Sequence, residues 1–184
     1  MSEEMIVRLC SPTLAGLKTG SLFSSPYGDI RQLMLELRAL NQKLVPKGLR
    51  VIPLRALQGR ALIYLYRPRR LKSDLANDEA AALLAGYGYP SDGGERCLGK
   101  LAQKLRSSEG FPHEIGLFLG YPPEDVRGFI ENRAAHAKLT GCWKVYGDEN
   151  KARRIFEQYK KCTSVYCTQW KRGKSIERLA VADR

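Results

Sequence analysis

The segment Phe111–Ile130 constrains the fold more than any other part of the chain. It predicts two short helices joined by a tight turn, because Pro112 suits the first position of a helix and Gly120 can adopt the left-handed conformation that ends one. Pro122 and Pro123 cannot continue the first helix, but they can open the second. Such a pair forms either a DNA-reading helix-turn-helix or a purely structural corner.

Spacing within this segment fits both interpretations. The small and apolar residues at the positions buried in such helix pairs are Ile115, Gly116, Leu119, Gly120, Val126 and Phe129. The second helix, however, begins with Glu124 and Asp125, whose carboxylates would face the phosphates of DNA. Only Arg127, Asn132 and Arg133 would favour such a contact, so the structural corner stays open as the alternative.

The remaining elements follow from hydrophobic periodicity, capping residues and turn residues. The sequence predicts helices over 29–45, 78–85, 95–106 and 148–161, a β-hairpin of strands 50–57 and 61–67, and strands over 141–147 and 176–181. This order predicts an α+β fold with a small, largely antiparallel sheet and helices packed on one side. We expect a single α+β domain over residues 1–184.

Two details of these elements can be tested directly. The first helix carries an apolar stripe, predicted to be core, at Ile30, Leu33, Met34, Leu37, Leu40 and Leu44. Pro53 cannot donate to a strand ladder, so the strand that contains it is expected to be an edge or irregular.

Charge is the most unusual feature of the composition. The formal net charge is +12, and the region 149–174 alone carries eight basic residues against two acidic ones. A concentrated positive field attracts phosphate-bearing partners, and four residues of the predicted basic helix are candidate anion-binding groups: Arg153, Arg154, Lys160 and Lys161. A solvated basic surface is the alternative. The aromatic residues interleaved here could stack on bases, but a place in the core is the favoured interpretation.

Cysteine usage and the N-terminus bear on the compartment. The five cysteines are scattered and include no C-x-x-C pair, so neither a zinc ribbon nor a thioredoxin-like motif is expected. The start of the chain is acidic and lacks the features of a signal peptide, and the apolar runs are too short to cross a membrane. We therefore expect a cytoplasmic protein with reduced cysteines and no membrane partner.

The segment 10–21 is rich in hydroxyls and glycines and is expected to be a loop. Cys10 is a candidate nucleophile if a neighbouring base or cation activates its thiol. Lys18, Thr19 and Ser21 are candidate anion-binding residues beside glycines whose backbone N–H groups could converge on a ligand. An ordinary loop with a buried thiol is the alternative.

His113 and Glu114 begin the first helix of the predicted pair. They do not form a metalloprotease motif, because position 117 is Leu where a second histidine would be needed, and no metal site is expected. Imidazole titrates near neutral pH, so His113 is a candidate general acid or base with Glu114 beside it. Alternatively, Glu114 complements the helix dipole and His113 packs.

Over nearly its full length the chain resembles an uncharacterised family of small proteins found mainly in anaerobic bacteria, catalogued as a domain of unknown function. The likeness rests on Cys10-x-Pro-Thr-Leu-Ala-Gly-x-Lys18, on the segment Phe111–Val126, and on Gly141-x-Trp-Lys-Val-Tyr146. The resemblance implies a cytoplasmic protein of low-oxygen metabolism, and it suggests that the three segments belong together. It implies no activity, cofactor or catalytic residue.

Together these patterns favour binding of a small anionic ligand, with catalysis on it left open. The site would be built from the 10–21 loop, the helix start at 113–114, and Lys144 of the 141–147 strand. The alternative is a nucleic-acid-binding protein that uses the basic 148–161 helix and the helix pair. An acidic protein partner fits the charge equally well, and the sequence leaves the cofactor and the oligomeric state unknown.

Overall fold

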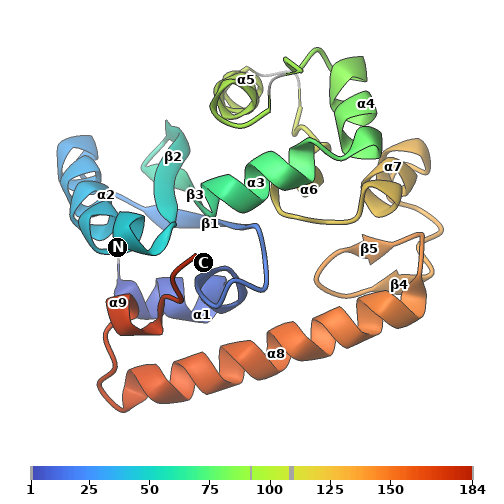
Figure 1. Ribbon diagram of the computed structural model, residues 1–184. Helices are drawn as coiled ribbons and strands as arrows, with labels where there is room; N and C mark the ends of the chain where they lie inside the picture. Colours follow the sequence, from blue (N-terminus) through green and yellow to red (C-terminus); the bar gives the residue numbers. More distant parts are fainter. Residues whose placement is uncertain (1, 92, 108–109, 184) are drawn as a thin grey trace. The chain divides into compact units, whose positions relative to one another are not determined.

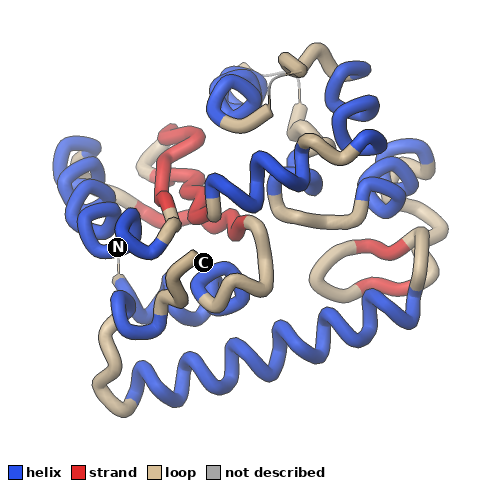
Figure 2. Tube along the Cα trace, viewed as in Figure 1, coloured by secondary structure: helices blue, strands red, loops and turns tan. Residues whose placement is uncertain are grey.

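A computed structural model of the chain describes residues 2–91, 93–107 and 110–183 (Figures 1 and 2). The chain forms two compact units. The first comprises Met1–Arg69 together with Tyr159–Arg184, and the second comprises Arg70–Gln158. The chain has an α+β fold, in which a small antiparallel sheet is combined with many helices, as the sequence predicts.

The first unit contains a three-stranded antiparallel sheet in the order β1-β3-β2. Its elements are α1 (Glu3–Leu14), β1 (Gly20–Pro26), α2 (Ile30–Leu44), a 3₁₀ turn (Val45–Lys47), β2 (Arg50–Leu57), β3 (Arg60–Tyr66) and α9 (Ile176–Leu179). Strands β2 and β3 are the predicted hairpin, and α2 is the predicted first helix. Asp29 caps α2 by accepting a hydrogen bond of 2.8 Å from the Arg31 N–H.

Strand β2 is an edge strand, as Pro53 predicts, and its register shifts between Pro53 and Arg55. The side chain of Asn41 in α2 bonds both backbone groups of Val51, donating to the carbonyl at 2.8 Å and accepting from the N–H at 2.9 Å. Because these groups point away from β3, alternation along the strand places Pro53 in the same outward orientation. The missing N–H of Pro53 therefore lies on the open edge, where it costs no ladder bond.

The core of the first unit lies against one face of the sheet. Phe23, Val51, Ile63 and Leu65 share this face and are buried in one cluster with residues of α1, α2 and α9. Helices α1 and α2 both contact the sheet (Figure 1). The core helices of this unit therefore pack on this face, while Tyr64 and Tyr66 are buried on the opposite face.

The predicted core stripe of α2 is only partly correct. Its four leucines are buried, but Ile30 is 43% exposed and Met34 is 48% exposed. In an α-helix these two side chains project about 50–90° away from the middle of the leucine row, because successive residues turn by about 100°. Periodicity identified the apolar positions but not the width of the face that the sheet covers.

The expectation of a loop over 10–21 is wrong, because α1 continues through Cys10 to Leu14. Pro12 lies inside this helix, where it lacks the N–H that would bond the preceding turn. Nearby, the Ser11 hydroxyl donates to the carbonyl of Val7. The buried face of α1 stabilises the helix in spite of the proline, so tertiary packing overrides the local signal.

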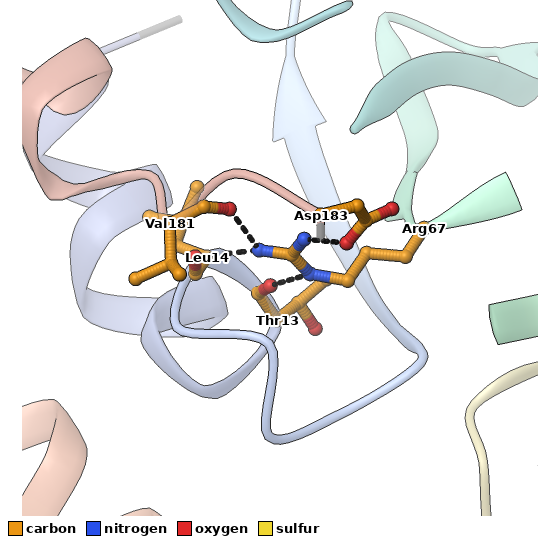
Figure 3. A network of polar contacts seen from close by, with 5 residues as sticks. All are labelled: Thr13, Leu14, Arg67, Val181 and Asp183. Carbon is orange, nitrogen blue, oxygen red and sulfur yellow. Dashed lines mark hydrogen bonds and ion pairs between the residues drawn. The ribbon is translucent and has the colours of Figure 1, made fainter. Parts of the chain in front are cut away.

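A buried arginine closes the C-terminal end of α1 (Figure 3). Arg67 is 2% exposed, and its guanidinium donates to the carbonyls of Thr13, Leu14 and Val181, each at 2.8 Å. It also pairs with the carboxylate of Asp183. Helix ends leave carbonyls without partners and carry partial negative charge, so a cation there satisfies both demands. Arg67 is therefore a structural cation of the interior rather than part of the solvated basic surface.

The second unit consists mainly of helices and has a two-stranded antiparallel sheet of β4 and β5. Its elements are α3 (Pro68–Leu75), α4 (Asp78–Gly86), α5 (Glu95–Arg106), α6 (Ile115–Phe118), α7 (Pro123–Glu131), β4 (Leu139–Thr140), β5 (Lys144–Val145) and the start of α8 (Glu149–Lys171). The prediction for α5 is confirmed in full and that for α4 within one residue. The predicted 141–147 strand is reduced to β5, because the chain bends on either side of it.

The helix pair α6 and α7 is confirmed as a tight corner. Gly116 allows close contact, since a Cβ there would lie 2.8 Å from Cγ2 of Val126. Gly120 has φ +74°, the left-handed conformation expected at the end of the first helix. Asp125 at the start of α7 is buried, and its carboxylate accepts three hydrogen bonds of 2.7 Å from the Trp143 indole and from backbone N–H groups of residues 146 and 147.

Two C-terminal predictions need correction. Helix α8 begins after Asp148, which accepts a hydrogen bond from the Lys151 N–H at 2.9 Å, but it continues ten residues beyond the predicted end at Lys161. The predicted strand over 176–181 is wrong, because Ile176–Leu179 form α9. Ser175 caps α9, and the apolar residues of this turn belong to the core cluster of the first unit.

Candidate functional site

A pocket of about 220 Å³ lies in the second unit between the end of α5 and the segment that leads into α6. Lys104 and Ser107 line it from α5, and Ile130 lines it from α7. The remaining lining residues are Tyr87 and the segment 110–114. The pocket therefore contains His113 and Glu114, the two candidates that the sequence placed at this helix start.

Glu114 is a buried carboxylate with two partners. It is 2% exposed, and its Oε1 atom accepts hydrogen bonds from the Tyr89 hydroxyl at 3.0 Å and from the Lys104 ammonium at 2.7 Å. A buried charge is tolerated when it is paired and hydrogen-bonded in this way. Burial, together with the Glu114 carboxylate, raises the pKa of Tyr89 well above its ordinary value, so this phenol stays protonated and donates.

Lys104 is the cation of the pocket. Its ammonium lies 5.0 Å from the ring centroid of Tyr87 and 4.9 Å from that of Tyr89, distances at which an aromatic face attracts a cation. The ammonium is held by Glu114 and the two rings, and the side chain as a whole is 26% exposed. An ammonium has three N–H donors, which leaves capacity for an anion that enters the pocket.

His113 lies at the exposed side of the pocket, with its ring packed between aromatic residues. The imidazole meets Phe129 edge-on, with ring centroids 5.1 Å apart, and is tilted against Phe111 at 6.5 Å. These contacts orient the ring without burying it. The pocket thus combines an ammonium, an accessible imidazole and apolar walls, a set that suits a small molecule bearing both a negative charge and an apolar part.

Sequence reasoning missed Lys104 and its two tyrosines. Lys104 lies in the last turn of an amphipathic helix, where a lysine is expected for the helix dipole alone. Tyr87 and Tyr89 stand in a stretch that reads as a turn. No spacing signal links either group to Glu114, because the contacts join residues 10 and 25 positions apart.

Cys10 has the surroundings of a structural thiol. It is fully buried, and burial raises the pKa of its thiol from the ordinary 9.0 to about 12, although Lys18 and Ser21 act in the opposite direction. The thiol therefore stays protonated at neutral pH, whereas a nucleophile needs the thiolate. Nothing in these surroundings supports the predicted nucleophile.

Two of the other candidates near Cys10 also face inward. Thr19 and Ser21 are buried, and the Ser21 hydroxyl shares a hydrogen bond of 2.9 Å with that of Thr13. The backbone N–H of Lys18 donates to the carbonyl of Pro12 at 3.1 Å, and the Thr19 carbonyl accepts from the Arg67 N–H at 2.9 Å. These groups form hydrogen bonds within the first unit. They therefore support a structural role in the turn between α1 and β1 more than a role in anion binding.

Lys144 and the basic residues of α8 complete the predicted set. The Lys144 ammonium donates to the carbonyl of Ala134 at 2.6 Å. The exposed Arg153 pairs with Glu149, and the Arg154 side chain donates to a backbone carbonyl of its own helix at 3.3 Å. Lys160 and Lys161 are exposed on the same helix.

The predicted ligand site draws its residues from both units. Cys10, Lys18, Thr19 and Ser21 lie in the first, and His113, Glu114 and Lys144 lie in the second. Within the second unit, His113 and Glu114 share the pocket described above. A single cleft formed by all three segments stays a prediction.

Two further searches covered the described part of the chain. Across residues 2–91, 93–107 and 110–183, no three side chains of the His, Cys, Asp and Glu types come together in a way that could hold a metal ion. None of the helices in these ranges combines the length and the apolar character that a membrane span requires.

Residues 6–180 match the family described as "Protein of unknown function (DUF3793)", so the chain belongs to this family. The matched region runs through both compact units and includes every candidate site residue named above. A search of curated proteins and a search of solved structures each found no match. Function must therefore be argued from the residues of the chain.

Proposed function

We propose that the protein binds a small anionic molecule in the pocket formed by Lys104, His113 and Glu114. Lys104 supports this most directly, because its partly exposed side chain lines the pocket while Glu114 and two tyrosine rings hold its ammonium in place. A fixed cation loses less conformational entropy on binding than a mobile surface lysine would. His113 adds a second donor at the exposed side.

The size of the pocket narrows the ligand. A volume of 220 Å³ equals roughly seven water molecules at liquid density, and it lies below the roughly 300–1,000 Å³ of pockets that enclose drug-sized ligands. We therefore propose a compact carboxylate or phosphate compound, with its anionic group on Lys104 and its apolar part against Phe111 and Tyr87. Any acid–base step on this ligand would use His113, the imidazole that lines the pocket.

The test follows the imidazole signals of the two histidines by NMR. Sodium phosphate and sodium benzoate are added separately, and benzamide serves as the neutral counterpart of benzoate. We expect a saturable shift of the His113 signals with at least one of the two anions and little change with benzamide. The exposed His136, which does not line the pocket, is the internal control.

Two variants assign the binding to Lys104. In Lys104→Gln the saturable shift should be lost, whereas Lys100→Gln in the same helix should retain it, because Lys100 does not line the pocket. His113→Gln changes an exposed side chain and should weaken anion binding, measured by calorimetry, without unfolding the protein. Equal responses to benzoate and benzamide, or an unchanged response in Lys104→Gln, would refute the proposal.

Nucleic-acid binding by α8 is the second candidate function. Arg154 and Lys161 are exposed and stand seven residues apart on this helix, as do Arg153 and Lys160. Residues at this spacing project in nearly the same direction, which suits contact with consecutive phosphates. The helix pair adds little to this candidate, since the face of α7 that carries Asp125 and Val126 is buried.

Salt dependence tests this second candidate. If the four cations contact phosphates, the affinity for a DNA or RNA oligonucleotide should fall steeply with salt. Replacing all four by Gln should then reduce the slope of log K against log salt by about 3–4. A charge-matched control replaces four other exposed cations, Arg8, Arg69, Lys72 and Arg106. An equal loss in both variants would show attraction by net charge alone.

A further inference from the structure

An open apolar groove of about 610 Å³ lies in the first unit between α2 and the edge strand β2. Its α2 side presents Ile30, Met34 and Leu35, and its strand side presents residues 51–53. The three α2 side chains are 43%, 48% and 58% exposed, respectively. Large apolar side chains gathered in one groove are unfavourable in water and are typical of a surface that another molecule covers.

The charges that line this groove are all positive. Arg31 and Arg38 line it beside the apolar residues, and no Asp or Glu is among the described residues of its lining. Glu36, the acidic residue of α2, is about 160° around the helix from Arg38, because successive residues turn by about 100°. The groove flank of α2 is therefore apolar and basic, which complements an apolar and acidic surface.

The strand side of the groove disfavours an added β-strand. The outward N–H and C=O groups of Val51 are already bonded to the side chain of Asn41. Pro53, the next outward-facing residue, has no N–H to donate. A partner would therefore be recognised through side chains rather than through backbone pairing, as happens when an amphipathic helix lies in a groove.

We infer that the groove binds an acidic amphipathic helix of another protein. Its apolar residues would cover Met34 and Leu35, and its carboxylates would face Arg31 and Arg38. A second copy of this chain fits poorly, because two basic flanks would face each other on molecules of charge +12. A flat lipid surface fits poorly as well, because the apolar residues line a groove rather than a protruding face.

The probe is a synthetic helical peptide with leucines along one face and glutamates on both sides of that face. A second peptide carries lysine in place of every glutamate. The protein is labelled with ¹³C at its three methionine methyl groups, of which Met34 lies in the groove and Met5 packs against the core. We expect the acidic peptide to shift the Met34 signal saturably and to leave Met5 unchanged.

Charge reversal provides the decisive control. The double variant Arg31→Glu/Arg38→Glu should bind the acidic peptide at least roughly tenfold more weakly and should gain affinity for the lysine peptide. Arg8→Glu reverses an exposed arginine of α1 outside the groove and should change neither affinity. Leu35→Ser should weaken binding, whereas Leu9→Ser, which alters another exposed leucine, should not.

Four outcomes would overturn the inference. They are the absence of a Met34 shift at millimolar acidic peptide, equal binding of the two wild-type peptides, binding to phosphatidylglycerol vesicles in place of the peptide, and self-association in sedimentation equilibrium that Leu35→Ser abolishes. The groove and the Lys104 pocket lie in different units. The outcome of the peptide experiment therefore neither supports nor refutes the proposed binding of an anion in the pocket.

Discussion

Segments 10–21 and 110–114 look alike in sequence, since both place polar residues beside glycine or proline. In the first segment the side chains of Thr13 and Ser21 bond each other, and the carbonyls at the end of α1 bond Arg67. In the second, His113 is exposed and Glu114 orients Lys104 toward a pocket. The polar groups of one segment close the fold, whereas in the other the exposed His113 lines a pocket.

The difference lies in where each segment finds its hydrogen-bonding partners. A buried polar group must be bonded, so a segment whose partners lie within its own core becomes structural. Around Glu114 the partner Lys104 is itself only partly buried, so the pair that satisfies the carboxylate also places a lysine side chain in the lining of the pocket. Four predictions test this comparison, in order of decreasing effect.

Arg67→Leu should be the most destabilising change. It removes a buried cation that bonds three carbonyls and Asp183, and it leaves the end of α1 without those donors (Figure 3). We expect a loss of about 3–5 kcal/mol in the free energy of unfolding, measured by urea denaturation. Arg69→Leu, at an exposed position, should change it by less than about 0.5 kcal/mol. Similar effects in both variants would show that the network contributes little.

Lys104→Met should be the next most destabilising, because it leaves the Glu114 carboxylate buried with only Tyr89 as a described partner. Lys104 is partly exposed, so we expect the free energy of unfolding to fall by about 2–4 kcal/mol, somewhat less than when a fully buried ion pair is broken. Combining it with Glu114→Gln should restore part of the loss, since no unpaired buried charge then remains. Failure of this rescue in a double-mutant cycle would mean that the two residues act independently.

The Cys10 thiol should make stability fall at alkaline pH. Folding raises its pKa from 9.0 to about 12, so the unfolded chain loses this proton first as the pH rises. The contribution of the protonated Cys10 thiol to the free energy of unfolding is fully present below pH 9. It is lost between about pH 9 and 12, by up to about 1.4 kcal/mol per pH unit. Cys10→Ala should flatten the decline between pH 9 and 10. An unchanged slope would indicate that the thiol is less buried than described.

The smallest expected changes in stability come from Ser21 and His113, one residue from each of the segments 10–21 and 110–114. Ser21→Ala removes a buried hydrogen bond and should cost about 1 kcal/mol. His113→Gln changes an exposed side chain and should alter stability by less than about 0.5 kcal/mol while weakening anion binding. Thermal unfolding with and without benzoate measures both effects. A larger stability loss for His113→Gln would assign that ring a structural role.

Local patterns predicted most of the regular elements. The capped, periodic stretches that form α2 and α5 were readable because each signal lies within a few residues. The hairpin of β2 and β3, the edge position of Pro53 and the corner of α6 and α7 were also predicted, since glycine and proline restrict the backbone at their own positions.

Only the tertiary structure decided which polar residues became structural and which line a pocket. Arg67 contacts residues 53 and 54 positions before it and 114 and 116 positions after it, and Lys104 bonds Glu114, ten positions after it. Packing also stabilised α1 in spite of Pro12 and left Ile30 and Met34 exposed. The sequence by itself determined the elements and the charge, because those depend on neighbours along the chain. Burial and partnership depend on contacts between distant residues, which no local pattern specifies.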